Sequence, residues 1–226
     1  MSTTFSNEPA TAQLAAGAVT RQPRQGRSRA SFERMLAATR QLMLERGSED
    51  FTLQEVSDIG NVSIGSIYLR FQSKENLLHA VIADELDRVS ADEQEMIATV
   101  LSESTRLADF VPLFVDRYYE VLRDHAPFLR LIMARAAFDP AVSEPGKITA
   151  HKTQMASIAA IVSFRDEIGS DDPELRASAT FQIIFATIAR CLSLGSTVES
   201  ADAQNWTMLR TELATMCLAY LKHAEG

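Results

Sequence analysis

The chain has 226 residues, of which 46% are hydrophobic and 23% charged, an ordinary composition for a folded protein with one or two domains. No apolar run approaches the roughly 18 residues of a membrane span, and the N-terminus lacks a secretory pattern, so we expect a cytoplasmic protein. The net charge of −8 is unevenly divided. Residues 21–46 hold seven Arg and two Glu, whereas residues 79–226 hold thirteen Lys or Arg and twenty-two Asp or Glu. A basic end on an acidic body favours a small DNA-binding head.

Residues 1–26 are rich in Ala, Thr, Ser, Gln and Gly and show no clear period, which predicts a disordered tail. Its basic end comprises Arg21, Arg24, Arg27 and Arg29. Such a cluster can neutralise phosphates or enter a minor groove. The alternative is that it only keeps the terminus soluble.

Residues 31–46 have the pattern of an amphipathic helix. Ser31 is placed to cap it, and Arg46-Gly47 is a suitable ending. One face carries Phe32, Met35, Leu36, Leu42 and Met43. We expect this helix to support the two that follow.

Two short helices joined by a tight turn are predicted between Phe51 and Phe71. Thr52 is an N-cap candidate, and Glu55 three residues later completes a capping box. Gly60-Asn61 interrupts the apolar spacing with residues that tolerate a left-handed backbone, and Ser63 can cap the second helix. A helix, a short turn and a second helix are the parts of a helix-turn-helix, whose second helix enters the DNA major groove.

The remainder reads as helix with no strand alternation, so the fold class is all-α. A helix should run from residue 74 to about 101, and a loop should span 139–146. Further helices are expected at 106–123, 127–138, 147–168, 174–194 and 203–222. Cys191 and Cys217 lie in apolar helical patterns and are interpreted as reduced, buried thiols, with a redox role as the alternative.

The last two helices are candidates for a subunit interface. Apolar residues in 181–192 cover more than one face of a helix, so one face is available for a partner. We expect 174–194 and 203–222 to form a homodimer interface, which also suits two heads on a palindromic site. The alternative is one large monomeric core.

Residues 28–88 resemble the TetR family of bacterial transcriptional regulators. The resemblance is carried by the run Val62-Ser63-Ile64-Gly65-Ser66-Ile67-Tyr68, by Phe71, and by Lys74-Glu75 followed by Leu77. The sequence departs from the family pattern at Ser57, at Gly60-Asn61 and at Ile64, where the family commonly has Ala, Ala-Gly and a polar residue.

The resemblance implies a three-helix DNA-binding domain at 27–73 and a helical ligand-binding and dimerisation domain at 74–226. It places Thr52, Ser63, Tyr68 and Lys74 on phosphates and Ile64, Gly65, Ser66 and Arg70 towards bases, while Arg70 could equally hold a phosphate. Arg27 and Arg29 would add positive charge that attracts the DNA phosphates. The implied partners are a palindromic double-stranded DNA operator and a small-molecule effector, and the implied function is a repressor released by that effector.

Candidate lining residues for an apolar or aromatic effector are Phe110, Phe114, Tyr118, Phe128, Met133, His151, Met155 and Phe185, although for any single one ordinary core packing is the favoured explanation. His125 and His151 lack metal-ligand spacing, so we predict no metal site, no cofactor and no catalytic residues. Two other readings stay open: a nucleoid-type DNA binder without a ligand, and an all-helical enzyme.

Overall fold

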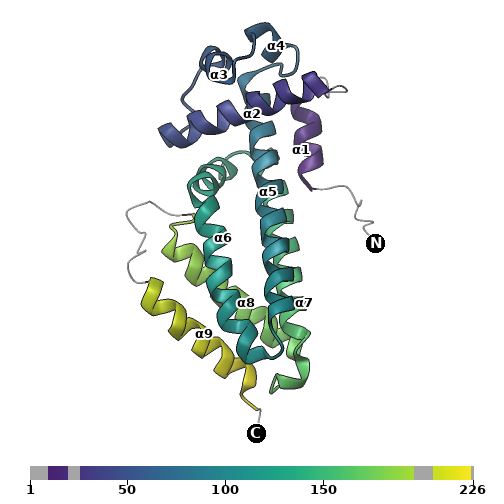
Figure 1. The fold of residues 1–226 in the computed structure, drawn as a ribbon, viewed down its shortest axis with the longest axis vertical. Helices are drawn as coiled ribbons and strands as arrows, with labels where there is room; N and C mark the ends of the chain where they lie inside the picture. The colour runs from purple at the N-terminus through teal and green to yellow at the C-terminus, as the bar shows by residue number, and fades with distance from the viewer. Residues whose placement is uncertain (1–9, 20–25, 196–205, 225–226) are drawn as a thin grey trace. The chain divides into compact units, whose positions relative to one another are not determined.

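The computed structural model describes residues 10–19, 26–195 and 206–224, and every regular element within these ranges is a helix (Figure 1). The elements are α1 (Ala10–Ala18), α2 (Gly26–Arg46), α3 (Leu53–Gly60), α4 (Ile64–Tyr68), α5 (Lys74–Glu103), α6 (Leu107–Ala136), α7 (Pro140–Val162), the 3-10 turn η1 (Arg165–Glu167), α8 (Pro173–Cys191) and α9 (Trp206–Lys222). The predicted all-α class is confirmed for the described residues. None of their helices is long and apolar enough to cross a membrane.

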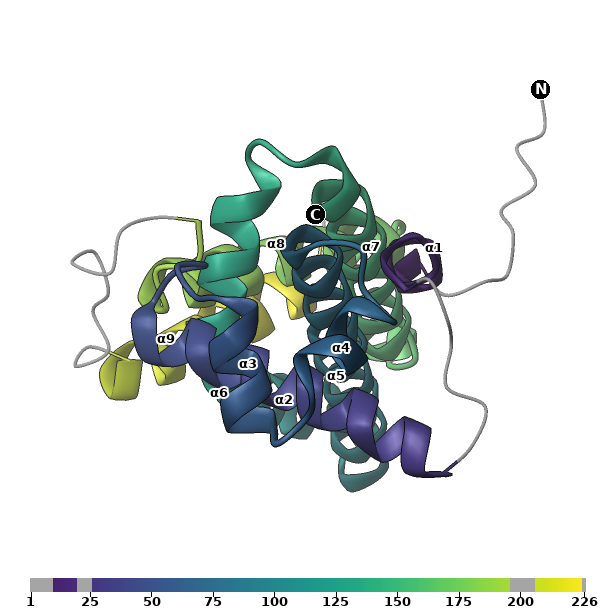
Figure 2. The ribbon, with the colours of Figure 1, turned by 90° about the horizontal axis from the view of Figure 1, so that it is seen from above.

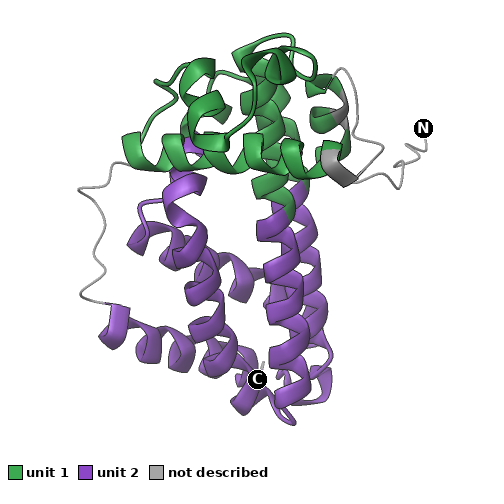
Figure 3. Ribbon diagram, turned by 45° about the horizontal axis from the view of Figure 1, so that its top comes forward, with its two compact units in different colours: residues 1–87, 134–148 green, residues 88–133, 149–226 purple. Residues whose placement is uncertain are grey.

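The chain divides into two compact units (Figure 3). Unit 1 comprises Met1–Asp87 and Ala134–Ile148, and unit 2 comprises Arg88–Met133 and Thr149–Gly226. The predicted domains at 27–73 and 74–226 stay a prediction. The beginning of α5 and the α6–α7 junction belong to the unit that contains α3 and α4.

Local side-chain chemistry builds α3 and α4 as the sequence predicts (Figure 2). Thr52 Oγ1 accepts a hydrogen bond from the Glu55 amide at 3.2 Å, and the Glu55 carboxylate accepts one from the Thr52 amide at 2.7 Å. Asn61 ends α3 with a left-handed backbone at φ 46°. Ser63 Oγ accepts from the Ser66 amide at 3.1 Å and starts α4. These caps fix where each short helix begins and ends.

An apolar core positions α3 and α4 against α2. Met35, Val56, Ile67 and Phe71 are inaccessible to solvent, and the Phe71 ring stacks on Phe32 with ring centres 5.8 Å apart. Gly60 lies where α3 passes α2. A Cβ added there would be 3.2 Å from the Arg34 carbonyl oxygen, so the close approach of the two helices requires glycine.

The N-terminal region contains more helix than its composition predicts. The predicted tail 1–26 includes α1, whose Leu14 and Ala18 are buried and whose Thr11 donates a hydrogen bond to Asp87 within unit 1. Helix α2 begins at Gly26, so Ser31 lies inside it and the predicted cap is wrong. Burial of two apolar side chains stabilises α1 where local propensity alone gives little.

Two predicted breaks lie inside helices. Residues 106–138 were expected as two helices, but α6 runs unbroken through Pro127. The ring removes one backbone donor, and continuous burial on both sides of it, including Ala126 and Phe128, keeps the helix intact. The predicted loop 139–146 is the first part of α7, which begins at Pro140, a favourable first helical position.

Unit 2 is built around aromatic side chains and closes with the two predicted C-terminal helices, α8 and α9. Ring centres follow one another from Phe110 to Phe114 at 5.5 Å, to Tyr118 at 5.4 Å and to Phe181 at 5.9 Å. Cys191 and Cys217 are buried free thiols, as predicted, and burial raises the pKa of Cys217 to about 11. Residues 203–205 of the last predicted helix lie outside the described residues.

Candidate nucleic-acid interface

Helix α4 and its cap present small polar groups to solvent. Ser63 and Gly65 are exposed, Ile64 and Ser66 are half-buried, and Tyr68 is 58% exposed. The Ser63 and Ser66 hydroxyl oxygens lie 2.7 Å apart, so both serines sit at the N-terminus of the helix. Thr52 is also exposed, and its hydroxyl donates to Glu55 at 2.9 Å. A short helix start with exposed hydroxyls can receive phosphate oxygens or base edges.

Gly65 is not required by the packing of unit 1. A Cβ added to it would meet nothing within 4 Å, in contrast to Gly60. Glycine inside a helix costs about 1 kcal/mol relative to alanine. The absence of a side chain at this exposed position therefore suits the close approach of an external molecule to the backbone of α4.

Two predicted DNA contacts are engaged within unit 1. Arg70 is 8% exposed, and its guanidinium donates to the Ser28 carbonyl and hydroxyl oxygens at 2.8 Å each. Lys74 Nζ donates to the Glu49 carbonyl oxygen and lies 4.3 Å from the centre of the Phe51 ring. Both side chains hold the helix-turn-helix to neighbouring segments. Their contact with DNA stays a prediction.

The basic N-terminal residues are only partly described. Arg29 is exposed on α2 and pairs with Glu33 at 2.9 Å. Arg27 lies in α2, but its side chain is outside the described residues, as are Arg21 and Arg24. Their role at DNA stays a prediction.

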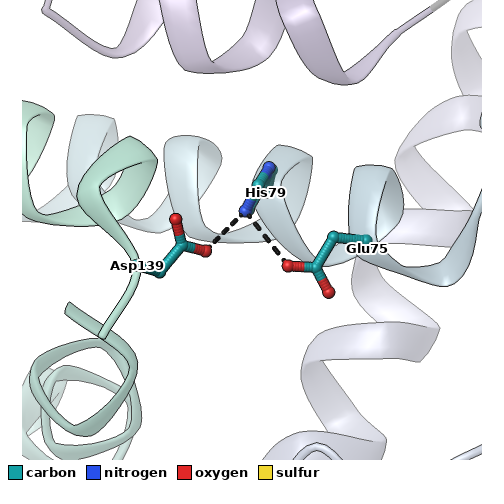
Figure 4. Close-up of side chains that lie close together, drawn as sticks. All are labelled: Glu75, His79 and Asp139. Carbon is teal, nitrogen blue, oxygen red and sulfur yellow. Dashed lines mark hydrogen bonds and ion pairs between the residues drawn. The ribbon is translucent and has the colours of Figure 1, made fainter. Parts of the chain in front are cut away.

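The structure also brings together three groups that the sequence does not associate. His79 Nε2 lies 2.8 Å from Asp139 Oδ2 and 3.5 Å from Glu75 Oε1 (Figure 4). These are metal-ligating groups, and their ligand atoms all lie within 4.8 Å of one another. However, the Arg135 guanidinium pairs with both carboxylates, so an arginine already supplies positive charge there. No local signal reveals this cluster because Glu75 and Asp139 are distant in sequence.

The predicted effector-lining residues all lie in unit 2 and differ in exposure. Phe110, Phe114, Tyr118 and Phe128 are buried in its interior, while Met133 and Phe185 are half-buried. His151 and Met155 are exposed on α7. The role of all eight at an effector stays a prediction.

A buried carboxylate lies beside Tyr118 of the aromatic row Phe110–Phe114–Tyr118–Phe181. Glu93 on α5 is 5% exposed, accepts a hydrogen bond from Thr153 Oγ1 at 2.5 Å and interacts with the Tyr118 hydroxyl. Burial raises its pKa to about 7, although these hydrogen bonds and nearby His125 act in the opposite direction. Among the described residues, the buried hydroxyls of Ser157 and Thr180 in the same unit have no hydrogen-bond partner. The interior of unit 2 therefore combines aromatic surface with polar groups.

We expect Glu93 to make the stability of the protein depend on pH. The raised pKa means that the folded state keeps the proton up to about pH 7, while the unfolded chain releases it near 4.5. This contribution to stability is fully present below pH 4.5 and is lost as the pH rises to 7. Glu93→Gln should therefore raise the free energy of unfolding above that of the wild type by roughly 3 kcal/mol at pH 8 and by little at pH 4.5. The size follows from about 1.36 kcal/mol for each unit by which the pKa is raised.

Urea unfolding of both proteins across this pH range measures the effect. Glu95→Gln, at an exposed glutamate two residues along α5, is the matched control and should follow the wild type. Parallel pH curves for wild type and Glu93→Gln would contradict the assignment.

An all-helical chain with a capped helix-turn-helix and a separate helical unit defines the class of helix-turn-helix DNA-binding proteins. Residues 35–81 match the family model described as bacterial regulatory proteins, tetR family. The chain is 30% identical over 104 residues to the HTH-type transcriptional repressor KstR2 of Mycolicibacterium smegmatis, a match that covers 46% of this chain and 48% of that repressor. The matched stretch thus spans about half of that relative.

Solved structures share the fold over most of the chain. A putative TetR-family transcriptional regulator from Mesorhizobium loti is 20% identical with a TM-score of 0.66, covering 88% of this chain and 96% of its own. GusR of Salmonella enterica is 24% identical with a TM-score of 0.59, covering 85% and 96%. Residues 35–81 thus match the tetR family model, and most of the chain has the fold of solved TetR-family regulators.

Proposed function

We propose that the protein is a sequence-specific DNA-binding transcriptional repressor that acts as a homodimer and is released from its operator by a small molecule. The observation that carries the proposal is the capped α3–α4 pair with its exposed Ser63, Gly65 and Tyr68. Open space around Gly65 fits a backbone that approaches DNA. The similarity to a transcriptional repressor supports repression.

In this proposal Ser63, Thr52 and Tyr68 contact phosphates, while Ile64, Gly65 and Ser66 face the bases. Ile64 can touch a thymine methyl but cannot form a bidentate base contact. Arg70 and Lys74 act first by placing α4, because their polar atoms are engaged within unit 1.

The dimer is proposed to form through α8 and α9. Large apolar side chains stay exposed along both helices: Leu175 and Ile183 on α8, and Met208, Leu209, Met216 and Tyr220 on α9. Burial of these side chains against a second copy would remove their apolar surface from water. Two-fold symmetry would then present two copies of α4 to a palindromic site.

The effector is proposed to bind unit 2. A groove of about 380 Å³ between α5 and α6 has Met96, Val100 and Val121 in its lining together with Asp92 and His125. This volume lies in the range of small-molecule sites. The aromatic row and Glu93 do not line this groove. They lie in the interior of unit 2, and they support an apolar or aromatic effector with a hydrogen-bond donor that reaches this interior. Displacement of the protein from its operator by members of a compound library tests this part.

We expect two substitutions in α4 to distinguish phosphate contacts from base contacts. Tyr68→Phe should lower affinity about 10-fold for every DNA sequence, because it removes one hydrogen bond to a charged phosphate. Ser66→Ala should instead change affinity several-fold at particular base positions. Fluorescence anisotropy with the selected operator and with random DNA measures both.

Ser102→Ala removes a hydroxyl from an exposed serine near the end of α5 and serves as the control, with unchanged affinity expected. An equal loss on operator and random DNA for Ser66→Ala would refute its assignment as a base-facing residue.

A further inference from the structure

An acidic side chain stands on each side of the helix-turn-helix. Glu49 precedes α3 and Glu75 lies in the first turn of α5, directly after the turn that follows α4. Both carboxylates pair with one arginine. Arg135 Nη1 lies 2.7 Å from Glu49 Oε2, and its Nη2 pairs with Glu75 Oε1. One guanidinium therefore joins the two ends of the helix-turn-helix.

Arg135 is itself fixed at the α6–α7 junction. Its side chain is only 10% exposed, and its Nε donates to Asp139 Oδ2 at 2.9 Å. The other carboxylate oxygen of Asp139 accepts from the Ala141 amide at 3.0 Å, at the start of α7. Burial alone would raise the pKa of Asp139. The hydrogen bonds from His79 and Arg135 outweigh this effect and keep that pKa below its usual range.

The charges in this cluster explain why the arginine matters. Glu49, Glu75 and Asp139 supply three negative charges within reach of a single guanidinium. Without Arg135, the three carboxylates would repel one another, most strongly at Asp139, whose side chain is the least exposed of the three. His79 contacts Asp139 and Glu75 but does not reach Glu49 by any described contact (Figure 4). Arg135 is therefore the described side chain that bonds to all three.

A divalent cation on His79, Glu75 and Asp139 is the competing interpretation of the same geometry. Such an ion would have to displace Arg135 from both carboxylates. The guanidinium already satisfies them with directed hydrogen bonds, which favours arginine as the resident cation.

We propose that Arg135 is a positioning residue for DNA binding, which sets the placement of α3 and α4 by holding Glu49 and Glu75 to the α6–α7 junction. The inference rests on the proposed function. Removal of the arginine lets both ends of the helix-turn-helix move, so binding must first order them and weakens on all sequences alike. This role does not require Arg135 to touch DNA.

The test compares Arg135→Gln and Arg135→Lys with wild type, at a temperature where circular dichroism shows all three folded. We expect Arg135→Gln to lose about 10-fold in affinity on operator and random DNA alike, which is of the order of one charged hydrogen-bond pair. Arg135→Lys should recover part of the loss. Amide hydrogen exchange in residues 50–73 of the free protein should quicken in the glutamine variant. Arg106→Gln, which breaks an exposed pair with Asp109, is the control and should change neither quantity.

If Arg135→Gln does not fold, Glu49→Gln provides the test, because it releases only one end of the helix-turn-helix from Arg135. It should give a smaller loss of DNA affinity together with faster amide hydrogen exchange in residues 50–73. Wild-type exchange rates and affinity in the variants would overturn the proposal. So would stoichiometric binding of Zn²⁺ to wild type accompanied by a rise in DNA affinity that His79→Gln abolishes. Failure of the wild type itself to bind DNA would refute the proposed function, while the exchange measurement would still decide the role of Arg135.

Discussion

Glutamates introduced together at Ile183 and Met216 are expected to convert the protein from a dimer to a monomer. Both side chains are large, apolar and exposed, on α8 and α9 respectively. A buried, unpaired carboxylate in an apolar interface costs several kcal/mol, which is enough to separate the subunits. The affinity for a palindromic operator should then fall by roughly 100-fold or more, since each monomer reads one half-site.

Analytical ultracentrifugation and operator titration measure the two effects. Met155→Glu places the same charge on an exposed methionine of α7 and should leave both quantities unchanged. A double variant that remains dimeric would show that α8 and α9 do not form the subunit interface.

Phe71→Ala should lower the free energy of unfolding by about 3–5 kcal/mol, the usual cost of emptying a buried phenylalanine site. The ring is fully buried, stacks on Phe32, and follows α4 directly. Its loss leaves a cavity between α2 and the helix-turn-helix. We therefore expect DNA binding to be lost together with stability.

Urea unfolding followed by circular dichroism measures this change. The control is Ile148→Ala, at an apolar residue of the same unit that is 52% exposed, and its expected cost is below about 0.5 kcal/mol. A cost for Phe71→Ala as small as that of the control would contradict the described core of unit 1.

The helix-turn-helix could be predicted closely because its determinants are local. The Thr52 capping box, the left-handed Asn61 and the Ser63 cap each act within three or four residues, and the structure reproduces all three. The family resemblance adds the expected roles of the same residues.

Other boundaries depend on burial, which local sequence does not reveal. Pro127 and the Pro145-Gly146 pair are breaking signals, yet both lie inside helices. Helix α1 forms in a segment whose composition predicts disorder. In each case tertiary packing outweighs the local preference.

The least predictable features are polar contacts between distant residues. Arg70 pairs with Ser28 across 42 positions, and Arg135 with Glu49 across 86. The sequence predicts that Arg70 reads a base or holds a phosphate, and it gives no sign that the guanidinium also donates to Ser28. The burial of Glu93 could not be predicted either, because its hydrogen-bond partner Thr153 lies 60 positions away in the sequence.

Selection of bound sequences from a random DNA pool by the purified wild-type protein tests the central claim most directly. We predict enrichment of a palindromic consensus, whose half-sites are separated by a spacing that places two copies of α4 in successive major grooves. A pool that binds without sequence enrichment, or that does not bind at all, would contradict the account of this protein as an operator-binding repressor.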